Sequence, residues 1–137
     1  MDELKKCKLL QQIANTLVVY AYHIENNGLV NGKTGIMLFL YKYARYTNNE
    51  FYEDFAGEIL DGLMRVSASL PLDFENGLAG LGWTICDLIE KKHVEGNADS
   101  VLSPIDKILL LDASHNKGIS VMDSALYLSK RWELTKE

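Results

Sequence analysis

The residues that could do chemistry in this chain are few and far apart. There are three histidines, His23, His93 and His115, and two cysteines, Cys7 and Cys86. No two histidines stand at metal-ligand spacing on one helix, and neither a Cys-X-X-Cys nor a His-Glu-X-X-His motif occurs. We therefore predict no metal site and no cofactor, and we interpret the histidines as surface or helix-end residues.

Two other groups could in principle bind or react. Asp73 and Glu75 could form a carboxylate pair at the mouth of a cavity, although acidic residues before a helix are more often caps. Lys33-Thr34 follows a glycine, as in phosphate-binding loops, but the Gly-X4-Gly-Lys-Ser/Thr spacing and a preceding strand are absent. We predict no catalytic residue.

The composition describes one ordinary globular domain. The 137 residues, 47% hydrophobic and 24% charged, suit a single domain over residues 1–137. A formal net charge of −5 without a basic cluster disfavours nucleic acid and anionic membranes as partners. The first residues lack the apolar core of a signal peptide, and no apolar run is long enough to span a bilayer. We expect a cytoplasmic protein.

Six helices and no strand are expected from the spacing of apolar residues. The helices are predicted at about 3–23, 34–46, 49–69 and 78–92, from between 97 and 103 to 111, and from 120 onward. Amphipathic helices alternate with helices that are apolar over most of their surface, which predicts outer and inner layers. Ser103-Pro104 offers a cap for the fifth helix. Cys7 and Cys86 fall within helices, where a buried cysteine behaves as a small hydrophobe.

A short motif repeats before the second and fourth helices. Asn31-Gly32-Lys33-Thr34-Gly35-Ile36 and Asn76-Gly77-Leu78-Ala79-Gly80-Leu81 are 45 residues apart, and a degenerate third copy occurs at Lys117–Met122. This spacing, with two helices per unit, predicts three helical hairpins. We expect the first glycine of each pair to supply positive φ and the second to let backbones approach closely. Gly32 and Gly77 should then share one conformation.

Residues 28–36 and 73–83, which contain these motifs, resemble the lanthionine synthetase C-like family, and the resemblance extends over about residues 26–128. It implies an all-α fold, namely an α/α toroid fragment of about six helices in two layers, with the Gly-X-X-Gly turns around a central cavity. The cavity-side turn residues are then the candidate binding residues: Asn31, Gly32, Lys33, Gly35, Asp73, Glu75, Asn76, Gly77 and Gly80.

The family's cyclases bind zinc through two cysteines and a histidine from later hairpins, and that zinc activates a peptide thiol. This chain has no Cys-His dipeptide, and Cys7 and Cys86 do not match the ligand positions. The resemblance therefore implies no zinc ligand and no catalytic residue here. We expect a non-catalytic, truncated member that acts as an interaction or scaffold module linked to peptide modification.

Two alternatives stay open from the sequence. The chain could be half of a zinc-dependent, thioether-forming cyclase that another chain completes, or a generic helical-repeat binding module. The expected partners are a second copy, a chain that supplies further hairpins, or a peptide. An arc of three hairpins leaves its end helices without neighbours, so the first and sixth helices should expose apolar residues. The candidates are Leu10, Leu17, Val121, Met122 and Leu126.

Overall fold

The computed structural model describes residues 2–115 and 119–136. It is 77% helical, and every regular element within the described residues is a helix. The elements are α1 (Glu3–Ala21), α2 (Lys33–Thr47), α3 (Glu50–Arg65), the short 3-10 helix η1 (Ser67–Ser69), α4 (Leu78–Glu90), α5 (Ala98–His115) and α6 (Ile119–Lys136). The all-α prediction is confirmed. None of the helices in these described ranges is both long and apolar enough to cross a membrane.

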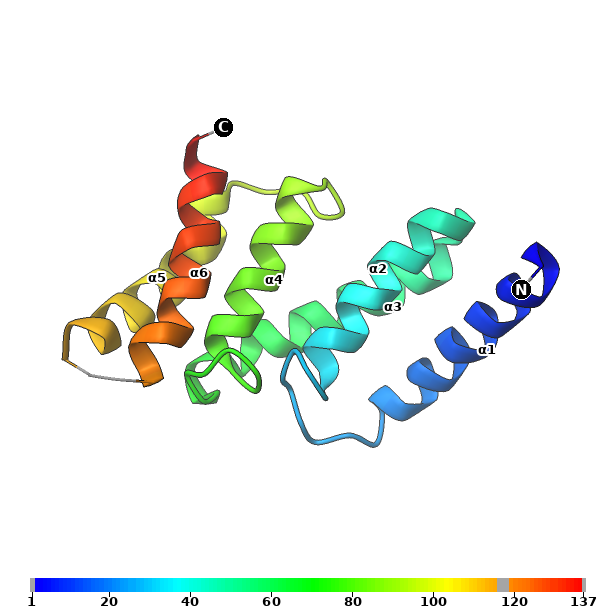
Figure 1. Cartoon of the computed structure of the whole chain (residues 1–137), viewed down its shortest axis with the longest axis horizontal. Helices are drawn as coiled ribbons and strands as arrows, with labels where there is room; N and C mark the ends of the chain where they lie inside the picture. The colour runs from blue at the N-terminus through cyan, green and yellow to red at the C-terminus, as the bar shows by residue number, and fades with distance from the viewer. Residues whose placement is uncertain (1, 116–118, 137) are drawn as a thin grey trace.

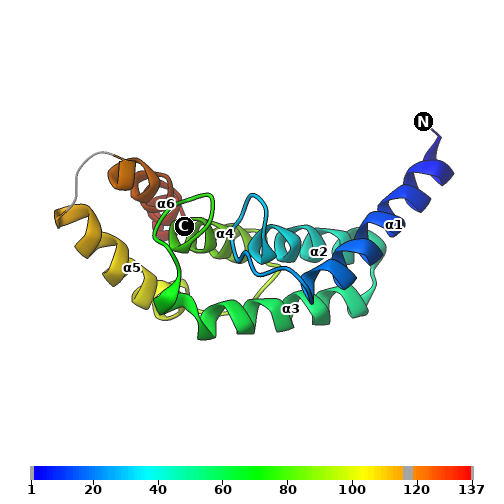
Figure 2. The same cartoon turned by 90° about the horizontal axis from the view of Figure 1, so that it is seen from below.

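The helices form two layers that curve into an arc (Figure 2). α2, α4 and α6 form one layer, α3 and α5 form the other, and α1 lies at one end of the molecule (Figure 1). α3 packs chiefly against α2, whereas α4 packs chiefly against α5 and α6. Ten of the 13 residues of α4 are buried, as its nearly continuous apolar pattern predicts. The predicted two-layer arrangement is therefore confirmed.

Two asparagines make the corner between α2 and α3. Asn48 ends α2 in the left-handed conformation, with φ at 52°, which asparagine tolerates better than most residues. Asn49 then caps α3, because its side-chain oxygen accepts a hydrogen bond from the Phe51 backbone N–H at 3.0 Å. The chain thus reverses within two residues and lays α3 directly against α2.

α5 begins upstream of the Ser103-Pro104 pair. Asn97 caps the helix, since its side-chain oxygen accepts a hydrogen bond from the Ser100 backbone N–H at 3.0 Å. Pro104 consequently lies inside α5. The expectation of a cap at Ser103 is wrong, because Asn97 already caps the first turn of the helix. Pro104, which has no backbone N–H, then removes one backbone hydrogen bond from the helix interior.

α4 and α6 approach each other closely because α4 has a glycine at their contact. A Cβ on Gly82 would lie 2.5 Å from Cε1 of Tyr127 and 3.1 Å from Cγ2 of Ile105. Tyr127 is fully buried, and its hydroxyl donates a hydrogen bond to Asp106 at 2.5 Å. Burial and this hydrogen bond raise the pKa of Tyr127 far above its usual range. The contact joins α4, α5 and α6 in one core.

The two cysteines have different environments. Cys86 is fully buried in α4, and burial raises the pKa of its thiol to about 12. Cys7 was expected to be buried but is exposed, with its Sγ 3.9 Å from the Tyr46 hydroxyl. The reason is that α1 buries only a narrow face, on which Ala14 and Ala21 are the two buried residues.

Both ends of the arc expose large apolar side chains. On α6 these include the predicted Val121, Met122 and Leu126. On α1, in contrast, Leu10 and Leu17 were expected to be exposed but are half-buried. They belong to the stripe of α1 that packs against the core. The apolar residues that α1 exposes are a different set: Leu4, Leu9, Ile13, Val19 and Tyr20.

Candidate functional site

The first glycine turn, residues 26–36, folds back over the start of α2. The Lys33 backbone N–H donates to the Asn26 carbonyl at 3.0 Å, and the Thr34 N–H donates to the Asn27 carbonyl at 3.3 Å. The Thr34 hydroxyl donates to the same Asn27 carbonyl at 2.6 Å. These bonds satisfy N–H groups of the first helical turn, which have no acceptor within the helix.

The second glycine turn, residues 71–81, repeats this pattern 45 residues later. The Leu78 backbone N–H donates to the Pro71 carbonyl at 2.7 Å, and the Ala79 N–H donates to the Leu72 carbonyl at 3.3 Å. Each bond joins positions equivalent to those joined in the first turn. The sequence repeat is therefore also a structural repeat. The third copy, at Lys117–Met122, falls partly outside the described residues.

Gly32 and Gly77 share one backbone conformation, but it differs from the expected one. Their φ angles are −138° and −142°, so the expectation of positive φ is wrong. Crowding by the backbone explains the glycines instead. A Cβ on Gly77 would lie 1.9 Å from the Pro71 carbonyl oxygen, and a Cβ on Gly32 would lie 2.5 Å from the equivalent Asn26 oxygen. No side chain fits at either position.

Gly35 and Gly80 provide the close approach that the sequence predicts. A Cβ on Gly35 would lie 2.2 Å from the Leu29 carbonyl oxygen. In the second turn, a Cβ on Gly80 would lie 2.1 Å from the equivalent carbonyl oxygen, that of Phe74. In both copies the turn therefore rests directly on the helix backbone.

The two turns lie next to each other at one rim of the arc (Figure 1). The Val30 backbone N–H donates to the Glu75 carbonyl at 3.2 Å. A Cβ on Gly28 would lie 2.4 Å from the same carbonyl oxygen, and a Cβ on Gly80 would lie 3.2 Å from the side-chain Cβ of Leu29. The first turn is thus seated against the second. The structure brings the predicted binding residues of both turns together through their backbone.

The side chains of the predicted set have separate surroundings. Asp73 Oδ2 accepts hydrogen bonds from the backbone N–H and the side-chain amide of Asn76, both at 3.0 Å. Asp73 is therefore engaged within its own turn. It does not cap α4, as the sequence suggested, because the N-cap position is Gly77 and no side chain accepts a capping hydrogen bond there. Asn31 and Glu75 are exposed, and Lys33 is half-buried.

A groove of about 530 Å³ runs between α1 and α2, along the free edge of the first turn. Three of the predicted binding residues, Asn31, Gly32 and Gly35, line it. The remaining lining residues are Leu17 and Tyr20 of α1, Leu29 and Val30 of the turn, and Ile36 and Phe39 of α2. None of these side chains is charged, so the groove suits an uncharged segment.

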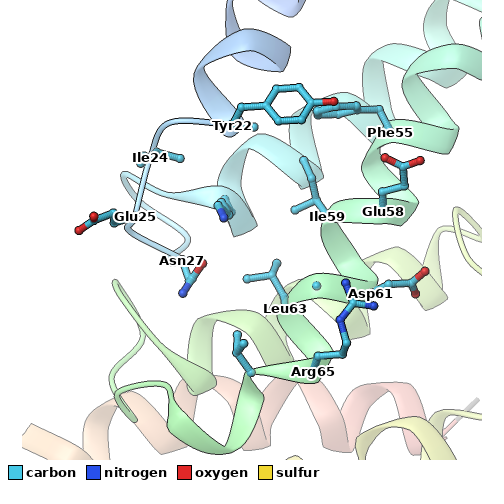
Figure 3. A pocket seen from close by; sticks show the side chains of 14 residues that line it. Tyr22, Ile24, Glu25, Asn27, Phe55, Glu58, Ile59, Asp61, Leu63 and Arg65 are labelled. Atoms are coloured by element: carbon cyan, nitrogen blue, oxygen red, sulfur yellow. The ribbon is translucent and has the colours of Figure 1, made fainter.

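A cavity of about 700 Å³ lies between the segment 22–27 and α3 (Figure 3). Apolar side chains such as Phe55 and Ile59 line it, with charged side chains such as Glu58 beside them (Figure 3). Lys33 is the one residue of the predicted set that lines it. No feature of the sequence indicates this cavity, because its walls come from two separate segments of the chain, 21–33 and 55–66.

A buried carboxylate near the C-terminal ends of the inner helices was missed by the sequence analysis. The Asp87 side chain is 3% exposed, and Lys91 and Lys130 lie 2.9 and 3.4 Å from its Oδ1. Lys42 lies 3.6 Å from its Oδ2. Burial alone raises the pKa of Asp87, but the Lys91 hydrogen bond and the lysine charges outweigh burial, so the pKa is lowered. The signal available in the sequence was an acidic residue placed between the apolar Cys86 and Leu88 of this helix.

Among the side chains that the structure describes, which do not include that of His115, the histidines and cysteines form no cluster. Among the described residues, no group of three or more histidine, cysteine, aspartate or glutamate side chains could hold a metal ion. His23 is exposed, and the ring of half-buried His93 lies 6.0 Å from that of Tyr41. Burial and the neighbouring charges of Arg45 and Lys42 lower the pKa of His93.

Comparison with known proteins gives no match to a family model, a curated protein or a solved structure. The candidate site therefore rests on the paired turns and the groove beside them.

Proposed function

We propose that this chain is a non-catalytic interaction module that works by joining a further polypeptide at the ends of its arc. On the resemblance of residues 28–36 and 73–83 to the lanthionine synthetase C-like family, the proposed setting is peptide modification. The chain contributes shape and contact surface, and the chemistry belongs to the protein that it joins.

The supporting observation is the uncovered apolar surface at the two ends of the arc. On α6, Met122 is 69% exposed, Leu126 is 52% exposed and Trp132 is 63% exposed. Interior units of a repeat structure have two neighbours, whereas end units have one and need a polar outer face to remain separate. Contiguous apolar patches above roughly a few hundred Å² are rare on monomers and mark interaction sites.

The proposed partner is a chain that continues the two layers of helices. A second copy of this chain fits, because its α1 end also exposes apolar side chains and could meet α6 head to tail. Such a contact forms a ring if the rotation between copies closes. A different chain that carries further helical hairpins would cover the same apolar surfaces.

Light scattering of the full chain at micromolar concentration tests the proposal. We expect a dimer or a larger closed assembly, and we expect the double variant Met122→Asp/Leu126→Asp to shift it to monomer. Val66→Asp is the matched control, since Val66 is an exposed apolar residue directly after α3, away from the arc's ends.

A hydrophobic dye separates the possible outcomes. If the wild-type chain is a monomer that binds the dye and the Met122→Asp/Leu126→Asp variant does not bind it, the partner is a different chain. A monomer that binds no dye would refute the proposal, because its ends would then need no partner.

A further inference from the structure

We propose that the groove between α1 and α2 binds a Gly-aliphatic-aliphatic segment of another polypeptide, in the form that the first glycine turn itself adopts. The inference depends on the proposed interaction function, because it specifies one contact through which the module holds a partner. It is carried by the internal repeat, which provides a filled copy of the same site.

The filled copy lies where the first turn meets the second. Gly28, Leu29 and Val30 form the inserted segment. The Val30 backbone N–H donates to the Glu75 carbonyl at 3.2 Å. Leu29 lies over Gly80, where a Cβ would come within 3.2 Å of the leucine Cβ, and Gly28 passes so close to Glu75 that a Cβ would lie 2.4 Å from its carbonyl oxygen.

The groove contains the equivalent receiving positions, 45 residues earlier in the chain. Val30, Asn31 and Gly35 correspond to Glu75, Asn76 and Gly80, and all three line the groove. Among the described residues, none donates a hydrogen bond to the Val30 carbonyl, whereas the equivalent Glu75 carbonyl accepts one from Val30. The groove is therefore the unfilled counterpart of a site that the chain fills elsewhere with its own backbone.

The equivalence defines the chemistry of the occupant. Its first residue is glycine, because backbone crowding at Gly28 leaves no room for a side chain. Its second residue is aliphatic, since it lies over Gly35 between the walls that Tyr20 and Phe39 provide. Its third residue donates a backbone N–H to the Val30 carbonyl. Main-chain pairing of this kind supplies affinity, while the side-chain pocket supplies specificity.

The occupant comes from a different polypeptide rather than from a second copy. In every copy the Gly28–Val30 segment is already seated against Glu75 and Gly80, so it is not free to enter a neighbour's groove. The uncharged lining of the groove also favours a segment without charged residues.

A peptide titration followed by NMR tests the proposal on the full, 15N-labelled chain. The probe is the acetylated and amidated hexapeptide Asn-Asn-Gly-Leu-Val-Asn, which copies residues 26–31. We expect saturable shifts of the backbone amides of Tyr20 and of residues 30–39. The same peptide with valine in place of glycine should bind at least about tenfold more weakly, because the valine side chain would overlap the receiving backbone.

Two matched protein variants locate the site. Tyr20→Asp places a charge in the groove wall, where the tyrosine is 52% exposed, and should weaken binding by about tenfold or more. Leu111→Asp changes an exposed leucine of α5 and should leave binding unchanged. Circular dichroism spectra that match the wild type show that both variants are folded.

Absence of saturable shifts would overturn the proposal, as would equal binding of the two peptides or full binding by Tyr20→Asp. These results are separable from the proposed function. If α6-dependent assembly persists while the peptide fails to bind, only the groove proposal is lost. If the peptide binds while the chain is a monomer that takes up no dye, the arc-end assembly is lost and the groove remains.

Discussion

Four glycines of the two turns, Gly32, Gly35, Gly77 and Gly80, each face a carbonyl oxygen of their own turn at a distance that no side chain could occupy. For Gly77 that oxygen belongs to Pro71, and for Gly80 it belongs to Phe74. An added methyl group would have to displace backbone, which is held by hydrogen bonds to the first turn of α4. Displacing hydrogen-bonded backbone costs more than moving the flexible end of a side chain, so these positions should be intolerant of substitution.

The substitution Gly77→Ala should accordingly lower the free energy of unfolding by about 3 kcal/mol, the upper range for overpacking. Gly57→Ala in α3 is the matched control, because a Cβ there would lie at an ordinary 3.6 Å from the Tyr41 hydroxyl. This control should gain about 0.5–1 kcal/mol from improved helix propensity. Urea denaturation followed by circular dichroism measures both changes. Equal stability of the two variants would contradict the crowding explanation.

At the scale of elements, the three inner helices meet at Asp87. The carboxylate comes from α4, while Lys42 comes from α2 and Lys130 from α6. Arg45 of α2 adds a further link, because its guanidinium donates to the Lys91 carbonyl at 2.8 Å, just after α4 ends. The inner layer is therefore joined by backbone contacts at the turn rim and by charge near the opposite ends of its helices.

Replacing Asp87 with asparagine should lower the free energy of unfolding by about 2 kcal/mol near neutral pH, through loss of charge-assisted hydrogen bonds. The folded-state pKa of Asp87 is lowered. Its stabilising contribution is therefore complete above the unfolded-state pKa of about 3.9, and is lost as pH falls through the folded-state pKa. Unfolding free energies measured from neutral to acidic pH should fall less steeply in Asp87→Asn than in the wild type.

Glu3→Gln is the control for that experiment, because it removes a carboxylate whose side chain is 79% exposed and which pairs with Lys6 at the surface. We expect it to change stability by only a few tenths of a kcal/mol, as for other exposed pairs. If Asp87→Asn and Glu3→Gln have equal effects at every pH, Asp87 does not join the inner helices as described.

The sequence predicts the inner helices well and the placement of α1 poorly, for a physical reason. A helix that is apolar all round, such as 78–90, has only one favourable environment, which is the interior. α1 carries two apolar stripes, one through Leu10 and Leu17 and another through Leu9 and Ile13, and only packing decides which is covered. The groove and the Asp87 contacts depend on such packing between distant segments. The turns were recognisable because their glycines recur, although glycine alone does not distinguish positive φ from crowding.

At the scale of the whole molecule, α1 is the least supported helix. It packs chiefly against α2, and the Tyr52 hydroxyl of α3 donates a hydrogen bond to Asn15 of α1 at 2.6 Å. Two of its 19 residues are buried, Ala14 and Ala21, compared with ten of 13 in α4. Regions with few buried contacts open at lower free energy than the global unfolding.

Hydrogen exchange should therefore reach the amides of α1 before those of α4. Tyr52→Phe removes the hydroxyl that donates to Asn15 and should speed exchange in α1 by about threefold to tenfold, the equivalent of one hydrogen bond. Exchange in α4 should stay the same in this variant. Mass spectrometry of exchanged peptides measures both helices in one experiment. Uniform exchange across α1 and α4 would show that the molecule opens only as a whole.

The joint between the two turns has an evolutionary consequence. It is formed by main-chain atoms and by glycines, so the other side chains can drift without breaking it: Lys33 in one unit stands where Leu78 stands in the next, and both units fold alike. A gene that encodes such a unit can be duplicated or shortened by whole units, and each new copy meets its neighbour through contacts that most mutations leave intact. Selection can then reshape the exposed surfaces of one unit while the ancestral joint is inherited unchanged.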